Sequence, residues 1–131
     1  MARITVINDS SEFLAVMDEL IGAMGHHMTG FHALHAALDD VVATMPELLI
    51  LDLRLEDERQ AISGWELLAL ARAHPTLRSV PVMLCTGDTD EVERRAAELE
   101  QIANVHVRPK PFAIHEMTDL IDALVPRTAA L

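Results

Sequence analysis

A strict alternation of two hydrophobic patterns constrains the fold of this chain most strongly. Short aliphatic runs alternate five times with segments whose apolar residues recur at helical spacing. The strand-like runs are 3–8, 26–32, 48–53, 80–86 and 105–107, and the helical patterns are 9–25, 33–45, 63–74, 88–103 and 113–125. Five strand–helix pairs predict an α/β domain in which helices cover both faces of a five-stranded parallel sheet.

Polar side chains stand where four of these strands end. Asn8 and Asp9 follow the first strand, Asp52 the apolar run of the third, Thr86 the fourth and Lys110 the fifth. In a parallel sheet the carboxyl ends of the strands meet at one edge, and ligands bind at that edge. The sequence therefore predicts that two carboxylates, an amide, a hydroxyl and an ammonium converge there.

This set of groups suits phosphate chemistry assisted by a divalent cation. Carboxylate and carbonyl oxygens are the ligands that Mg²⁺ prefers. A carboxylate can also attack phosphorus and form an acyl phosphate. Phosphoryl transfer then needs charge neutralisation and alignment, which Lys110 and Thr86 could provide.

Each residue also has a purely structural interpretation. Asp52 could be a turn residue at a strand end, Asp9 a helix cap, and Thr86 the start of a turn at Gly87. Lys110 is the only lysine of the chain, and a lysine in a loop is usually a solvated charge. The coincidence of all four at one edge favours the chemical interpretation.

Four of these segments carry a family resemblance. "ITVINDS", "LLILDL", "VMLCTG" and "RPKPF" resemble, in order and spacing, the signature segments of bacterial response-regulator receiver domains. The resemblance implies a flavodoxin-like, doubly wound sheet with strand order 2-1-3-4-5. It covers 3–125, so we expect a receiver domain over 1–125 and a tail or the start of a linker over 126–131.

The resemblance also implies roles for the edge residues. Asp52 would accept a phosphoryl group from the phosphohistidine of a sensor histidine kinase or phosphotransfer protein. Asp9, Asp52 and the backbone carbonyl of Arg54 would bind Mg²⁺, and Thr86 and Lys110 would hold phosphoryl oxygens. The peptide bond between Lys110 and proline would be cis. Such a domain is a signalling switch with a downstream protein partner and a possible homodimer, and not an enzyme in the usual sense.

The sequence departs from the family pattern at several positions. Asn8 replaces a usual second acid, so it would reach the metal only through water and Mg²⁺ affinity should be weaker. Val107 replaces the usual switch aromatic, and the neighbouring His106 should face the opposite side of the sheet. Arg54 and Asp88 stand where the family controls the attacking water, and an ion pair between them could slow hydrolysis.

The loop after Asp52, "RLEDERQAISG", is longer than usual and strongly charged. Its charges fit a solvated surface, and a partner contact or a partial cover over Asp52 is the alternative. These departures leave a second function open, a pseudo-receiver that acts only as a protein-interaction module. A phosphohydrolase of the Asp-x-Asp type is disfavoured, because Asp52 is followed by Leu53 and Arg54. A flavin carrier is disfavoured because Asp9 would repel the flavin phosphate.

Composition limits the partners and the compartment. The formal charge of −11 and a pI near 4.9 disfavour binding to nucleic acid or anionic lipid. One cysteine, Cys85, fits a reducing cytoplasm and, within an apolar strand, a buried structural thiol. No apolar run approaches the ~20 residues that span a bilayer.

Two further expectations concern methionine and histidine. Aromatic residues are scarce, so methionines should help to fill the core: Met17, Met24, Met28, Met45, Met83 and Met117. His26, His27, His32 and His35 could imitate metal ligands, but no third ligand of suitable spacing accompanies them.

Overall fold

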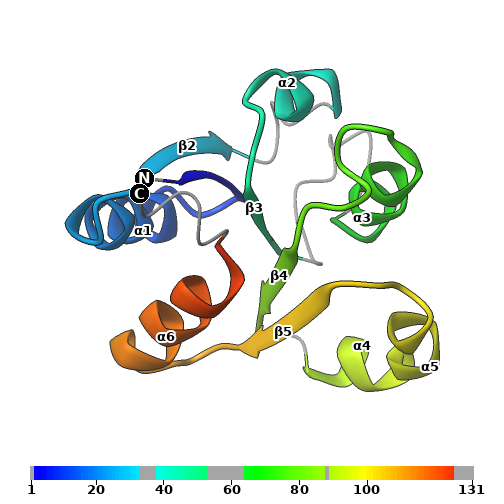
Figure 1. The fold of residues 1–131 in the computed structure, drawn as a ribbon. Helices are drawn as coiled ribbons and strands as arrows, with labels where there is room; N and C mark the ends of the chain where they lie inside the picture. Colours follow the sequence, from blue (N-terminus) through cyan, green and yellow to red (C-terminus); the bar gives the residue numbers. More distant parts are fainter. Residues whose placement is uncertain (1, 33–37, 53–63, 88, 126–131) are drawn as a thin grey trace.

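The computed structural model describes residues 2–32, 38–52, 64–87 and 89–125. Strands and helices alternate along this part of the chain (Figure 1). The strands are β1 Arg3–Asn8, β2 His27–His32, β3 Leu48–Leu51, β4 Val82–Thr86 and β5 Val105–Pro109. The helices are α1 Ser11–Ala23, α2 Leu38–Ala43, α3 Gly64–Ala73, α4 Thr89–Arg94, α5 Ala96–Glu100 and α6 Ile114–Leu124. The predicted α/β class is confirmed.

The five strands form one parallel sheet in the order β2-β1-β3-β4-β5. This is the order that the family resemblance implies. β3 lies in the centre with all four residues buried, as its unbroken apolar run predicts. The register pairs Ile7 with Leu51 and Leu51 with Leu84, so β1, β3 and β4 end at the same edge.

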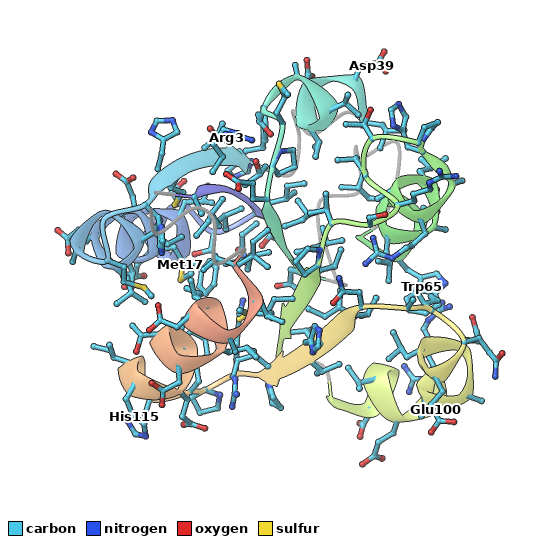
Figure 2. All side chains as sticks on the ribbon, viewed as in Figure 1. Arg3, Met17, Asp39, Trp65, Glu100 and His115 are labelled. Carbon is cyan, nitrogen blue, oxygen red and sulfur yellow. The ribbon has the colours of Figure 1, made fainter. Side chains whose placement is uncertain are left out.

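Helices cover both faces of the sheet, as Figure 1 shows. α1 and α6 lie on one face, and α2, α3, α4 and α5 lie on the other. The first face buries side chains such as Val6, Ile50 and Met17, and Figure 2 shows Met17 where α1 meets the sheet. The second buries Ile7, Leu51 and others, because successive residues of a strand point to opposite faces.

The predicted single helix over 88–103 is wrong. The structure has two short helices, α4 and α5, that are interrupted at Arg95, whose backbone leaves the helical region (φ −103°, ψ 11°). The guanidinium of Arg95 lies over the ring of Trp65, 4.3 Å from its centroid, and Figure 2 shows Trp65 between α3 and α5. The break in the helix thus coincides with a side-chain contact to a distant helix, which local helical periodicity does not encode.

The core role predicted for Met45 is also wrong. Its side chain is 62% exposed, whereas the other five methionines named above are buried in or packed against the core. Met45 lies past the end of α2 with φ 49°, a left-handed conformation typical of the residue after a helix. That turn directs the side chain outward, and the carbonyl of Met45 accepts a hydrogen bond from Arg3 Nε at 2.8 Å.

Arg72 closes the opposite, amino-terminal edge of the sheet. From the last turn of α3 its guanidinium donates to the carbonyls of Leu77, Ala103 and Asn104 at 3.0–3.1 Å. Burial lowers the pKa of this guanidinium from its ordinary value. The contacts join α3 to the segment that leads into β5.

Two sequence expectations concern sites and membranes. Among the residues that the structure describes, no three His, Cys, Asp or Glu side chains gather so that they could hold a metal ion. His35 lies outside the described residues, and His26 Nδ1 accepts a hydrogen bond from the backbone N–H of Ala2 at 3.0 Å. Within the described ranges, no helix has the length and apolar character needed to cross a bilayer.

Candidate functional site

The carboxyl edge of the sheet brings together the strand-end residues that the sequence singled out. Asp52 follows β3 directly, and its backbone N–H donates to Ile7 O of β1 at 3.4 Å. Thr86 ends β4, and its carbonyl accepts from the backbone N–H of Lys110 at 2.9 Å. These backbone contacts place Asp52 beside the end of β1 and Lys110 beside the end of β4.

Asp52 is a nearly buried carboxylate with a cation beside it. The residue is 8% exposed, and its Oδ2 lies 3.2 Å from Lys110 Nζ. The two residues are 58 positions apart in the sequence. A buried charge is costly unless it is paired, so the Lys110 ammonium compensates for the desolvation of Asp52.

Asn8 is the second polar neighbour of Asp52. Its Nδ2 donates toward Asp52 Oδ2 at 3.5 Å, and its Oδ1 accepts from the backbone N–H of Ser10 at 2.9 Å. The Ser10 contact fixes the orientation of the amide, because the NH₂ group cannot accept a hydrogen bond. Asn8 therefore presents a donor to the carboxylate where the family resemblance implies an acid.

Phe13 contributes a contact that sequence reasoning missed. Lys110 Nζ lies 4.3 Å from the centroid of the Phe13 ring, and this ring meets that of Phe112 edge-on with the centroids 6.5 Å apart. Both aromatic residues flank predicted edge positions in the sequence, Phe13 four residues after Asp9 and Phe112 two after Lys110. Their proximity in sequence to the edge residues is the signal that could have indicated a contact with the site.

Lys110 itself has the backbone that the resemblance implies. The peptide bond between Lys110 and Pro111 is cis.

Thr86 and the residues of β5 complete the edge. Thr86 is 1% exposed. Val107 is in register with Leu84 and packs on the face of the sheet that carries α3. His106 is in register with Met83, whose side chain is buried on the opposite face, beneath α1 and α6. His106 Nε2 lies 3.1 Å from Asn104 Oδ1. The predicted opposite orientation of Val107 and His106 is thus confirmed.

Cys85, next to Thr86, is the buried thiol that the sequence predicts. It is 1% exposed and packs in the core beneath α1 and α6. Burial is the main cause that raises the pKa of this thiol to about 12, with Lys110 opposing the rise and Asp52 adding to it. Such a thiol stays protonated and unreactive near neutral pH.

The donor set at the edge suits a magnesium ion. Asp9 follows Asn8 directly, so the carboxylates of Asp9 and Asp52 belong to residues at the ends of adjacent strands. Mg²⁺ is typically bound by one or two carboxylates and keeps several waters, so two carboxylates are sufficient. Arg54 and Asp88, which the sequence analysis placed near this edge, lie outside the described residues.

Solved structures share this fold. Chemotaxis protein CheY4 of Vibrio cholerae is 15% identical with a TM-score of 0.81, over 95% of this chain and 99% of that one. The receiver domain of sensor histidine kinase PA1611 from Pseudomonas aeruginosa PAO1 is 17% identical with a TM-score of 0.77, over 94% and 96% of the two chains.

Sequence comparisons point the same way. Response regulator MprA of Mycobacterium avium (strain 104) and of Mycobacterium bovis (strain BCG / Pasteur 1173P2) are each 28% identical over 126 residues. The match covers 96% of this chain and 52% and 51% of those proteins, so the chain spans about half their length. The family model for the response regulator receiver domain matches residues 4–122. The chain therefore belongs to the response regulator receiver domain family.

Proposed function

We propose that this domain is a phosphoacceptor, in which Asp52 receives a phosphoryl group from the phosphohistidine of a sensor histidine kinase or phosphotransfer protein. The observation that supports this most directly is the 3.2 Å pair between the nearly buried Asp52 carboxylate and the Lys110 ammonium. A solvated turn residue needs no such cation, whereas a buried carboxylate does. A nucleophilic carboxylate that must attack an anionic phosphoryl group does need one.

The proposed transfer is a displacement at phosphorus. A carboxylate oxygen of Asp52 attacks the phosphorus atom, the P–N bond to the donor histidine breaks, and its electron pair returns to the imidazole nitrogen. Lys110 Nζ neutralises charge on the phosphoryl oxygens, and the Thr86 hydroxyl donates a hydrogen bond to one of them. The product is an acyl phosphate on Asp52 and a free histidine on the donor.

Asp9, Asp52 and the backbone carbonyl of Arg54 would hold Mg²⁺, and Asn8 would reach it through a water. When bound, the ion would neutralise charge on the phosphoryl oxygens. The PA1611 receiver domain is described with a magnesium ion coordinated in its active-site cleft, which supports the same ion here.

The remaining roles follow from the same proposal. Arg54 and Asp88 would modulate the access of water to the acyl phosphate, and Val107 and His106 would modulate the change at β5. The phosphorylated form would present an altered surface to a downstream protein or to a second copy of the chain. A cytoplasmic location fits these partners.

The test is phosphorylation by a small donor. The protein is incubated with acetyl phosphate and Mg²⁺, and intact mass is measured for wild type and Asp52→Asn. We expect one added phosphate on wild type and none on the variant. Phosphate on both proteins would assign the modification to another residue and contradict the proposal.

A pseudo-receiver is the second candidate, and the orientation of Asn8 favours it. An amide that donates to Asp52 stabilises the carboxylate without adding the charge that would help to bind the metal. Under this alternative, wild type takes up no phosphate from acetyl phosphate or other small donors in the presence of Mg²⁺. The mass experiment thus decides between the two functions.

A further inference from the structure

We propose that Phe13 is a positioning residue, whose aromatic face holds the Lys110 ammonium where it meets the phosphoryl group on Asp52. The inference rests on the proposed function for its role in phosphorylation. It concerns a residue of α1 that lies outside the strand-end set.

The ammonium is located by two contacts of different kinds. Lys110 Nζ lies 3.2 Å from Asp52 Oδ2 and 4.3 Å from the centroid of the Phe13 ring. An ammonium within about 6 Å of a ring centroid is attracted by the negative face of the aromatic quadrupole. A lysine side chain has four methylene groups and many rotamers, so two simultaneous contacts restrict it strongly.

Phe13 is itself held in place by its surroundings. Its backbone N–H donates to Ser10 Oγ at 3.2 Å, which caps the first turn of α1. Its ring packs against the core and meets Phe112 edge-on, with the ring planes at 87°. Because the backbone of Phe13 is hydrogen-bonded and its ring is packed, the ring can act as a rigid support for the flexible lysine side chain.

The contacts form a closed circuit around the phosphoacceptor. Asn8 forms hydrogen bonds with Asp52 and Ser10, and Ser10 Oγ accepts from the backbone N–H of Phe13. The Phe13 ring contacts the Lys110 ammonium, which in turn donates to Asp52. The two contacts on the ammonium respond differently to phosphorylation. Transfer changes the Asp52 carboxylate, but it leaves the Phe13 ring as it was. Phe13 therefore keeps the ammonium at the edge while its anionic partner is replaced.

The chemistry predicts a specific pattern among variants. Leucine at position 13 keeps an apolar side chain but lacks the quadrupole, so Phe13→Leu should slow phosphorylation by acetyl phosphate about three- to tenfold. Phe13→Tyr keeps the aromatic face and should stay within about twofold of wild type. Phe31→Leu is the matched control, because Phe31 packs on the other face of the sheet.

A double-mutant cycle separates support of Lys110 from general packing. In a Lys110→Ala background, Phe13→Leu should have no further effect on the phosphorylation rate, because the supported group is gone. Equal losses in both backgrounds, or equal losses for Phe13→Leu and Phe13→Tyr, would overturn the proposal.

The single lysine also allows a test that needs no phosphorylation. Protein labelled with ¹³C-lysine gives one side-chain spin system, that of Lys110. The ring current of Phe13 should shift the Lys110 ε-methylene protons upfield in wild type and in Phe31→Leu, and the shift should collapse in Phe13→Leu. An unshifted signal in folded wild type sinks the inference about Phe13. A shifted signal in a wild type that takes no phosphate sinks the proposed function and leaves the placement of Lys110 by Phe13 standing.

Discussion

An asparagine at position 8 lowers the negative charge of the sheet edge but leaves Asp52 with a hydrogen-bond partner. Its amide is oriented by the backbone of Ser10 and donates toward the Asp52 carboxylate. Lys110 supplies the opposite charge from the other side. The Asp52 carboxylate is therefore compensated by the Lys110 cation and hydrogen-bonded by the neutral Asn8 amide.

This arrangement predicts weak Mg²⁺ binding that one substitution strengthens. Wild type should bind Mg²⁺ in the millimolar range, and Asn8→Asp should bind about tenfold more tightly because it adds a carboxylate. Isothermal titration calorimetry of both proteins measures the difference. Asn8→Ala is the control, since it removes the amide without adding charge, and its affinity should not exceed that of wild type. No tighter binding by Asn8→Asp would contradict the prediction.

The buried thiol of Cys85 predicts a stability change at high pH. Its pKa is about 12 in the folded chain, against an ordinary value of 9.0. Below pH 9 both states hold the proton, so the thiol makes no pH-dependent contribution. Between pH 9 and about 12 the unfolded chain loses a proton that the folded chain keeps, so stability falls as pH rises.

Urea denaturation of wild type and Cys85→Ala at pH 8, 9, 10 and 11 tests this prediction. The free energy of unfolding should fall more steeply for wild type, by up to about 1.4 kcal/mol per pH unit. The chain has no tyrosine and one lysine, so few other groups titrate in this range. Parallel curves for the two proteins would show that burial of the thiol does not govern this pH range.

At the scale of elements, long-range side-chain contacts join helices to one another and to the sheet. At Arg95, where the predicted helix is interrupted, the guanidinium lies over the ring of Trp65 of α3. Arg72 joins α3 to the segment before β5 through three carbonyls. The local hydrophobic periodicity does not encode either contact. The sequence could therefore predict the helical segments but not these contacts between distant segments.

The Arg72 junction predicts a loss of stability without a loss of chemistry. Arg72→Ala removes the donors of three carbonyls and should lower the free energy of unfolding by about 2–3 kcal/mol. Arg72→Lys, the matched control, keeps the charge and should lose less. Acetyl phosphate should still modify Arg72→Ala at the wild-type rate, because Arg72 lies at the opposite edge of the sheet from Asp52. A wild-type urea midpoint for Arg72→Ala would show that the junction contributes nothing.

At the scale of the whole molecule, the dominant feature is the excess of negative charge. The formal charge of −11 on 131 residues makes the folded chain repel itself more than the expanded chain does. Salt screens this repulsion, with a Debye length of about 10 Å at 0.1 M.

Added NaCl should therefore stabilise the protein. Raising NaCl from about 10 to 300 mM should increase the free energy of unfolding by on the order of 1 kcal/mol. Urea denaturation at several NaCl concentrations measures the increase. A variant that neutralises two exposed acids of α1, Asp18→Asn with Glu19→Gln, should respond less to salt. Destabilisation of wild type by NaCl would mean that attractive ion pairs outweigh the net repulsion.

The sequence by itself determined the layered α/β class and the residues at the carboxyl edge of the sheet. Alternating strand and helix periodicities are local properties, and parallel strands always end at the same edge. The family resemblance added the strand order. Asp52, Thr86 and Lys110 could therefore be assigned to one site without coordinates.

Only the tertiary structure decided which atoms meet at that edge. These details depend on single side chains. Lys110 pairs with Asp52, the Asn8 amide takes one orientation, and an aromatic ring lies beneath Lys110. Lys110 has two partners, Asp52 and Phe13, and both are far from it in the sequence. The physical reason is that periodicity fixes the face on which a side chain lies, whereas packing of distant segments fixes its rotamer and its partners.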